Sequence, residues 1–257
     1  MDLIDVIIFS VVEGITEFLP ISSTGHLILT SKILLIPQST FVKDFEIIIQ
    51  LGAILSIIYL YFDKLIKNKE VWKKILTAFI PTALVGFILF KFIKDFLLGN
   101  LYLTLTSLLL GGVLLIILEI IYKEKDNHVE EIEKISYSKA FIIGLFQSLA
   151  IVPGVSRSAT TIIPALFLGT KRKTAAEFSF LLAIPTMLAA TGLDLIKSEF
   201  TFSINEWVIL AVGFIGNFIT ALLVVKWFLV YIQNHSFIAF GIYRILVALI
   251  FWYILIK

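Results

Sequence analysis

The chain has 257 residues, of which 59% are hydrophobic and only 16% are charged, where roughly 25% is usual in soluble domains. Its 21 Lys and Arg residues against 19 Asp and Glu residues give a formal net charge of +2, too small for a nucleic-acid-binding surface. These numbers exclude a soluble globular protein and a nucleic-acid-binding protein, and they indicate an integral membrane protein. The chain contains no cysteine, which excludes disulfides and thiolate metal sites.

The first half of the chain begins with an interrupted apolar segment. Residues 3–36 contain Glu13, Glu17 and Pro20 ahead of an SSTGH sequence, which does not fit a single membrane-spanning helix. Three windows without Asp, Glu, Lys or Arg follow, at 47–62, 75–90 and 96–118. Each of these windows predicts a transmembrane helix.

The second half repeats this order. Residues 140–170 are broken by a PGVSR sequence, and uncharged windows follow at 178–193 and 207–225. A last window, 237–256, is apolar except for Arg244, whose guanidinium must face protein or water. Because irregular backbone at membrane depth must be buried or line a cavity, we predict an all-α membrane protein with six transmembrane helices and two re-entrant helical hairpins.

The two halves are related by an internal repeat. Three pairs of like residues are separated by 133 positions: Pro20 and Pro153, Ser23 and Ser156, Phe45 and Phe178. We therefore divide a single membrane domain, 1–257, into repeat halves 1–127 and 136–257. Each half holds one hairpin and three spans, and because three is odd, the second half must enter the membrane from the opposite side. The sequence thus predicts an inverted-topology repeat.

The basic residues predict the orientation of this repeat. Thirteen of the 21 basic residues lie in the connections 63–74, 119–139 and 171–173 or at Lys226. All four regions fall on one side of the predicted topology, which the positive-inside rule makes cytoplasmic. Both termini and the links near Lys43, Lys91 and Lys197 then face outward. The 119–139 connection is expected to be a solvated linker between the halves.

The first break carries two carboxylates that a membrane should exclude. Glu13 and Glu17 stand at i and i+4, so on a helix they share one face. Each charge at membrane centre costs roughly 2.5 to 3.5 kcal/mol, so we expect a functional site, with a structural ion pair between the halves as the alternative. In the SSTGH sequence, the hydroxyl groups can cap the next helix and Gly25 lets the backbone approach a ligand. His26 follows directly.

The PGVSRSATT sequence at 153–161 is typical of an anion-binding break. Free N–H groups and the dipole of the following helix favour a phosphate, and the Arg157 guanidinium can grip two of its oxygens. The neighbouring hydroxyl groups belong to Ser156, Ser158, Thr160 and Thr161. The 133-residue offset pairs Glu13 with Phe146, Glu17 with Ala150 and Thr24 with Arg157. Carboxylates in one hairpin and a cation in the other suit a divalent metal that bridges carboxylates to phosphate groups.

Both breaks resemble the signature regions of the bacterial undecaprenyl-diphosphate phosphatase family. The resemblance rests on EGITEFLPISSTGH at 13–26 and PGVSRSATT at 153–161, and it continues through FEIIIQLG, EFSFLLAIP and IYR at 242–244. It implies a multi-pass enzyme of the bacterial cytoplasmic (inner) membrane that removes the terminal phosphate of undecaprenyl diphosphate. Such an enzyme recycles the lipid carrier of peptidoglycan synthesis and, in excess, confers bacitracin resistance. The resemblance also implies an active site open to the outer face.

Carried over position by position, the resemblance implies the following site. The catalytic residues are Glu13, Glu17, Ser23, His26 and Arg157, and the substrate-binding residues are Ser156, Arg157, Ser158 and Thr161. Glu13 and Glu17 are expected to hold a divalent cation, Mg²⁺ or Ca²⁺. Three nucleophiles stay open: Ser23 with His26 as its base, which we favour, His26 itself, or a metal-bound water.

Two other classes of protein remain as alternatives. A polyprenyl-phosphate transporter, or flippase, would use the same inverted-repeat site, because secondary transporters also build binding sites from broken helices. A purely structural membrane protein leaves the cost of the buried charges unexplained. The expected partners are a polyprenyl diphosphate lipid substrate and membrane lipids, with no nucleic acid, and a homodimer is a further expectation.

Overall fold

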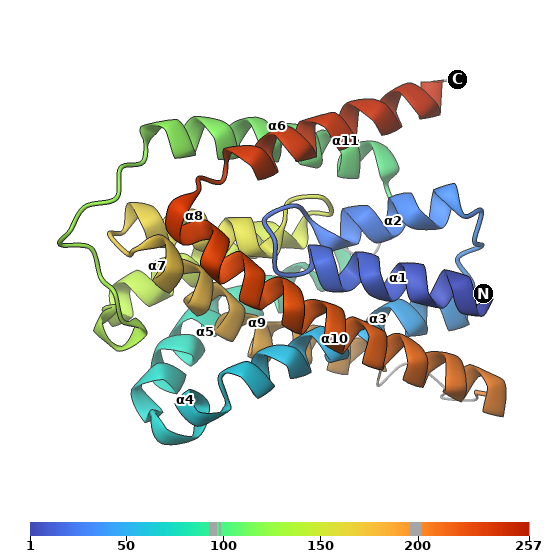
Figure 1. Ribbon diagram of the computed structural model, residues 1–257, viewed down its shortest axis with the longest axis horizontal. Helices are drawn as coiled ribbons and strands as arrows, with labels where there is room; N and C mark the ends of the chain where they lie inside the picture. The colour runs from blue at the N-terminus through green and yellow to red at the C-terminus, as the bar shows by residue number, and fades with distance from the viewer. Residues whose placement is uncertain (93–96, 98, 196–201, 257) are drawn as a thin grey trace.

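The computed structural model describes residues 1–92, 97, 99–195 and 202–256. Apart from an isolated bridge between Val129 and Thr170, these residues form helices and connecting segments without a strand (Figure 1). The predicted all-helical fold is confirmed.

The helices follow the predicted order in both halves. The first half contains α1 (Leu3–Thr16), α2 (Ser23–Ile33), α3 (Thr40–Leu60), α4 (Phe62–Lys67), α5 (Lys69–Phe92) and α6 (Leu101–Ile121). A short 3-10 helix, η2 (Ile132–Lys134), lies in the connection between the halves. The second half contains α7 (Tyr137–Gln147), the 3-10 helix η3 (Ser148–Ile151), α8 (Arg157–Phe167), α9 (Arg172–Leu195), α10 (Ile204–Asn234) and α11 (Ile238–Ile256).

Four helices within the described ranges are long and apolar enough to cross a membrane: α5, α6, α9 and α10. The chain is therefore a multi-pass membrane protein. The first turns of α3 carry Lys43, Asp44 and Glu46, and α11 is apolar but shorter. That the windows 47–62 and 237–256 also span the membrane, which would bring the total to six, thus stays a prediction.

The two interrupted segments each form a pair of short helices, α1 with α2 and α7 with α8. Both second helices have 11 residues and begin after a serine N-cap with positive φ, 73° at Ser22 and 62° at Ser156. These caps are 134 positions apart, not 133, because the hydrogen-bonded caps rather than the prolines set the helical register. This corrects the pairing of the halves. Arg157 stands opposite Ser23 instead of Thr24, and Gln147 stands opposite Glu13 in place of Phe146.

The helices of the two predicted repeat halves pack against each other. Helix α1 packs on α10 and α7 packs on α5, while α3 contacts α9 and α6 contacts α11. Figure 1 shows α1 and α2 reaching inward from one end of the long axis and α7 and α8 from the other. The halves therefore interlock, and the two breaks meet near the middle of the molecule.

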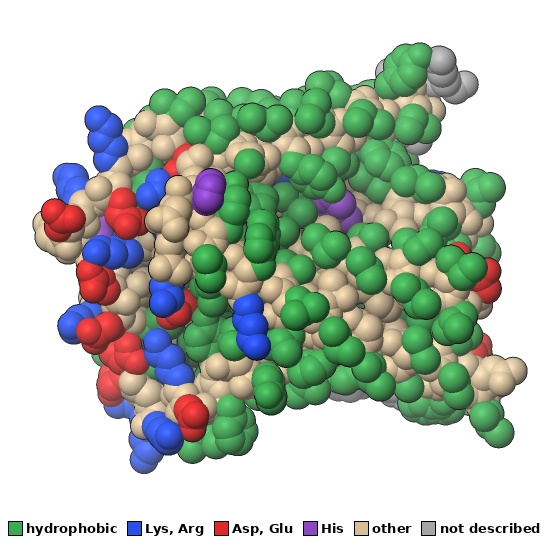
Figure 2. Space-filling view, viewed as in Figure 1, with side chains coloured by type: hydrophobic (Ala, Val, Ile, Leu, Met, Phe, Trp, Pro, Cys, Tyr) green, Lys and Arg blue, Asp and Glu red, His purple; other side chains and the backbone are tan. Residues whose placement is uncertain are grey.

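The basic connections share one end of the molecule, as the charge pattern predicts. Figure 2 shows charged side chains gathered at the end where α4 and the connection before α7 lie. Ion pairs join these segments: Lys64 Nζ lies 3.7 Å from Glu177 Oε2, and Arg172 pairs with Glu119.

Two connections differ from the prediction. The segment between α6 and α7 is not a free solvated linker, because the Val129 N–H donates to the Gly169 carbonyl at 2.8 Å and Ile132 is fully buried. Lys226 lies inside α10 rather than beside a connection, since a long lysine side chain can extend along a helix toward water. The predicted links near Lys91 and Lys197 fall largely outside the described residues.

Candidate active site

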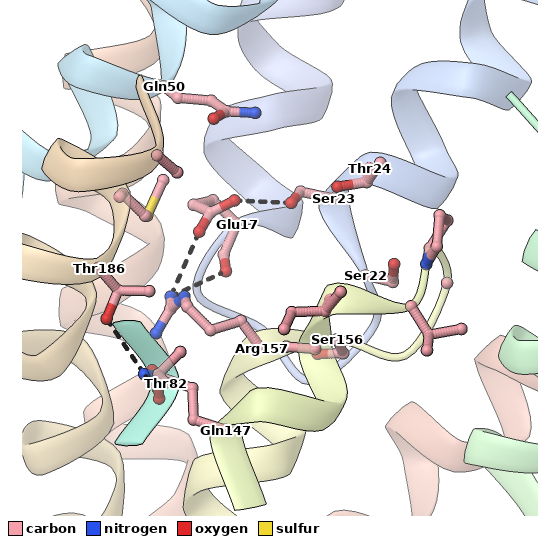
Figure 3. A pocket seen from close by; sticks show the side chains of 17 residues that line it. Glu17, Ser22, Ser23, Thr24, Gln50, Thr82, Gln147, Ser156, Arg157 and Thr186 are labelled. Carbon is pink, nitrogen blue, oxygen red and sulfur yellow. Dashed lines mark hydrogen bonds and ion pairs between the residues drawn. The ribbon is translucent and has the colours of Figure 1, made fainter. Parts of the chain in front are cut away.

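A cavity of about 280 Å³ lies where the two breaks meet (Figure 3). Its polar lining residues come from both halves: Glu17, Ser22, Ser23, Thr24, Gln50, Thr82, Gln147, Ser156, Arg157 and Thr186. This volume is just below the usual range for small-molecule sites, roughly 300–1,000 Å³. The cavity therefore has room for a small polar group such as phosphate rather than for a long chain.

Helices α2 and α8 both begin at this cavity. Ser22 Oγ accepts a hydrogen bond from the Gly25 N–H at 3.4 Å, and Ser156 Oγ accepts one from the Ala159 N–H at 3.3 Å. The first N–H groups of a helix have no intrahelical acceptor, and the helix dipole places partial positive charge there. The positive φ of both serines costs on the order of 1–3 kcal/mol each, a strain that tends to occur at functional sites. Two helix starts at one cavity favour an anion.

Glu17, Ser23 and Arg157 form one connected group beside these helix starts (Figure 3). Ser23 Oγ donates to Glu17 Oε2 at 2.6 Å, and Arg157 Nη2 donates to Glu17 Oε1 at 3.3 Å. The Arg157 and Glu17 side chains are only 11% and 6% exposed, and a buried ion pair needs such added hydrogen bonds to offset its desolvation. The group places a hydroxyl, an acceptor for its hydrogen and a cation at one point.

The Arg157 guanidinium is held by residues outside its own break. Nη1 donates to the Ser179 carbonyl on α9 at 3.0 Å, and Nη2 also reaches the Glu17 carbonyl at 3.5 Å. The Phe18 ring centroid lies 5.7 Å from the guanidinium carbon, within cation–π distance. These contacts leave the guanidinium little freedom to leave the cavity wall.

Glu13 lies one turn before Glu17 on α1 and is fully buried. Among the described residues, neither of its carboxylate oxygens has a hydrogen-bond partner, and buried acceptors normally have one. The described part of the chain contains no cluster of three or more His, Asp or Glu side chains suited to a metal. Glu13 and Glu17 would thus supply two ligands, with phosphate and water completing the set, a coordination that Mg²⁺ commonly accepts. Glu13 does not line the cavity, and both Glu17 oxygens already accept hydrogen bonds. The support for the predicted cation is thus the unpartnered pair of Glu13 oxygens.

His26 faces away from the cavity. Its Nδ1 lies 2.7 Å from the Ser22 carbonyl and its Nε2 lies 2.8 Å from the Tyr243 hydroxyl. Because a carbonyl only accepts, Nδ1 donates, and in a neutral ring Nε2 accepts from Tyr243. Helix α2 turns Ser23 toward Glu17 and His26 toward α11. The structure therefore differs from the predicted pairing of Ser23 with His26 as its base.

Ser158 and Thr161 also lie behind the cavity wall. Thr161 Oγ1 donates to Ser179 Oγ at 2.6 Å, and Ser158 Oγ is 3.4 Å from Ser156 Oγ. Helix α8 turns both side chains into the protein, so they support Ser156 and Arg157 instead of lining the cavity. Ser156, as predicted, lines it.

A buried amide joins three helices at the far wall of the cavity. Gln147 Nε2 donates to Thr82 Oγ1 at 2.9 Å and to Thr186 Oγ1 at 3.1 Å. Sequence reasoning did not place these two threonines in the site. The available signal was a lone hydroxyl in an apolar window, and such residues more often only join helices.

The chain is similar to known proteins along nearly its whole length. The profile of a family described as bacitracin resistance protein BacA matches residues 6–250. An undecaprenyl-diphosphatase of Aquifex aeolicus (strain VF5) is 56% identical over 245 residues, which cover 95% of each chain. An undecaprenyl-diphosphatase of Sulfurihydrogenibium sp. (strain YO3AOP1) is 51% identical over 98% of this chain and 100% of its own. One from Persephonella marina is 49% identical over 98% of each chain.

Proposed function

We propose that this chain, which belongs to the bacitracin resistance protein BacA family, is an integral membrane phosphatase that hydrolyses undecaprenyl diphosphate. The products are inorganic phosphate and undecaprenyl phosphate, the lipid carrier that cell-wall synthesis reuses. The observation that carries the proposal is the group of Glu17, Ser23 and Arg157 at a cavity lined by two helix starts. No observation on the described residues favours the transporter alternative, and a homodimer stays a prediction.

The diphosphate would bind between the starts of α2 and α8. Arg157 and the N–H groups of both helix starts offer donors and positive charge to its oxygens. Ser156 lines the same wall, with Ser158 and Thr161 supporting it from behind. The polyprenyl chain is too large for a cavity of about 280 Å³, so it would remain among the membrane lipids.

Ser23 is the nucleophile that the geometry supports best. Its Oγ attacks the terminal phosphorus while Glu17 Oε2, 2.6 Å away, takes the hydroxyl hydrogen. The bond from that phosphorus to the bridging oxygen breaks, and undecaprenyl phosphate leaves with the hydrogen. Glu17 then takes a hydrogen from water, whose oxygen attacks the phosphoserine. Inorganic phosphate departs, and Glu17 returns a hydrogen to Ser23.

Glu13 and Glu17 would hold the divalent cation, Mg²⁺ or Ca²⁺. The two unpartnered oxygens of Glu13 support this assignment. When bound, the cation would neutralise phosphate charge beside Arg157. Glu17 Oε2 would then serve Ser23, while Oε1, which accepts a hydrogen bond from Arg157 at 3.3 Å, would be shared between that guanidinium and the cation.

We further propose that six transmembrane helices and two re-entrant hairpins form an inverted repeat with halves 1–127 and 136–257. The pairing of α1 with α10 and of α7 with α5 supports this arrangement. The charged end of the molecule would face the cytoplasm, and the cavity would open outward from the cytoplasmic membrane. Single cysteines at positions 68 and 127 should therefore escape an impermeant thiol reagent in intact cells. Labelling of either without permeabilisation would overturn the orientation.

The test of the function is phosphate release by the purified protein in detergent. Hydrolysis needs no second compartment, whereas transport does, so detergent removes any contribution from lipid movement. We expect release of one phosphate from undecaprenyl diphosphate and none from undecaprenyl phosphate. A folded protein that releases no phosphate from the diphosphate in the presence of Mg²⁺ or Ca²⁺ would overturn the proposal.

A further inference from the structure

Arg244 is a buried cation outside the cavity, only 1% exposed and located on α11. Its guanidinium donates to four backbone carbonyls: Pro20 at 3.2 Å, Gly154 at 2.9 Å, Ser107 at 3.1 Å and Leu108 at 3.3 Å. The first carbonyl belongs to one break, the second to the other break, and the remaining two to α6. One side chain thus fastens both breaks to the same helix.

The two fastened carbonyls stand just ahead of the reacting groups. Ser23 follows Pro20 by three positions, and Arg157 follows Gly154 by three positions. Each carbonyl therefore fixes where the next helix begins, and with it the distance across the cavity. Arg244 does not line that cavity, so its contact with the reacting groups runs through these backbone positions.

Glycines make this arrangement possible. A Cβ at Gly111 of α6 would lie 2.1 Å from Arg244 Nη2, and a Cβ at Gly112 would lie 2.7 Å from the Gly241 carbonyl of α11. At Gly154, φ is +90° and a Cβ would lie 2.4 Å from the Thr104 carbonyl. Helix α6 thus admits α11, the guanidinium and the second break at close range, without contributing a side chain to the cavity lining.

We propose that Arg244 is a positioning residue for hydrolysis, holding the two breaks so that Ser23 and Arg157 keep the spacing that attack requires. The inference rests on the proposed phosphatase function. A misplacement of about 1 Å in a reacting group can cost on the order of 10² in rate. Loss of the four hydrogen bonds should therefore lower kcat while substrate can still bind through the helix starts.

Gly111→Ala gives the sharpest test, because it retains Arg244 and its charge but displaces the guanidinium. The atoms that the new methyl group meets are the end of a flexible side chain, and alanine favours a helix more than glycine does. We expect kcat per folded molecule to fall about 10²-fold with KM close to the wild type, and thermal stability to fall because the buried guanidinium loses hydrogen-bond partners. Gly86→Ala is the matched control, because a Cβ there meets nothing within 4 Å, and it should hydrolyse like the wild type.

Arg244→Lys is the second variant, for which an ammonium cannot reach carbonyls in four directions. We expect the same fall in kcat, with the protein folded. Wild-type kcat in either folded variant, or a loss of rate matched by an equal loss of folded protein, would overturn the positioning role. Absence of hydrolysis by the wild type would instead overturn the proposed function itself.

Discussion

The two breaks share one backbone and differ in their side chains. Ser22 and Ser156 cap α2 and α8 with φ of 73° and 62°, and the residue that follows each serine lines the same cavity. That residue is Ser23 in the first break and Arg157 in the second. A hydroxyl meets a cation because two helix starts with the same cap geometry point at one cavity. The comparison teaches that like backbone positions can present different chemical groups to one site.

Glu13 and Gln147 form a second pair of equivalent positions, which precede Ser23 and Arg157 by ten residues each. Gln147 finds two threonine hydroxyls, on α5 and α9, whereas both Glu13 oxygens lack a partner within the described structure. The amide nitrogen therefore joins one helix from each half, while the amide oxygen, Oε1, also lacks a partner within the described structure. Both Glu13 oxygens thus remain available, and the proposed divalent cation would supply them with a partner.

Ser23→Ala should have the largest effect on hydrolysis, because it removes the proposed nucleophile from the first break. We expect kcat to fall roughly 10³-fold or more, with unchanged metal dependence. Ser31→Ala changes another hydroxyl of α2 that lies outside the cavity and should leave kcat unchanged. Near-normal turnover by Ser23→Ala would move the nucleophile to His26 or to water.

Arg157→Lys tests the equivalent position in the second break. A lysine retains the charge but cannot grip phosphate with two parallel hydrogen bonds while contacting Ser179. We expect kcat/KM to fall about 10²- to 10³-fold. Arg172→Lys, which alters an ion pair at the charged end of the molecule, should retain wild-type kcat/KM. Equal efficiencies for Arg157→Lys and the wild type would show that a generic charge suffices.

Glu13→Gln tests the pair of Glu13 and Gln147, because it places an amide at both equivalent positions. If Glu13 holds the cation, the metal concentration for half-maximal rate should rise on the order of tenfold or more, because ligand charge sets hard-cation affinity. Titrating the purified variant with Mg²⁺ and Ca²⁺ at saturating lipid measures this shift. Glu46→Gln changes a nearby carboxylate that already has the hydrogen-bond partners Ser31 and Gln38, and its titration should match the wild type. A wild-type titration for Glu13→Gln would remove it as a ligand.

The smallest expected effect concerns the shared backbone itself. Alanine tolerates positive φ poorly, at a cost of roughly 1–2 kcal/mol, whereas glycine does not pay this cost. Ser156→Gly should therefore be more stable than Ser156→Ala in thermal unfolding. At Ser136, a cap with φ of −68°, the difference between Gly and Ala should be smaller by about 1 kcal/mol. Equal differences at both caps would argue against strain at the second break.

Much of the site follows from local sequence patterns. Carboxylates four positions apart, a serine-rich break and a PGVSR sequence placed Glu17, Ser23 and Arg157 together, because charged groups in apolar segments must meet each other or a ligand. The prolines, however, are 133 positions apart, whereas the helix caps are 134 positions apart, so the alignment of the two breaks predicted from the prolines was wrong by one residue. The caps at Ser22 and Ser156 depend on hydrogen bonds that proline spacing does not reveal.

Local sequence patterns do not predict contacts between residues that are far apart in the chain. His26 stands three residues after Ser23. At the start of a helix, this spacing allows the two side chains to point either to the same site or to different sites. Its actual partner, Tyr243, is 217 positions away. Arg244 carried a signal as a lone charge in an apolar window, but its four carbonyl acceptors come from three separate segments. No spacing rule connects such segments.

The stereochemical course at phosphorus tests the central claim, that Ser23 attacks the terminal phosphate, most directly. The substrate would be undecaprenyl diphosphate with sulfur in place of one terminal oxygen, made chiral at its terminal phosphorus with two oxygen isotopes. The purified protein would hydrolyse it in water that carries the third isotope, so that the released thiophosphate is chiral. Attack by Ser23 followed by attack of water inverts the phosphorus twice, so we predict overall retention of configuration. Overall inversion would mean a single direct attack by water and would contradict the account.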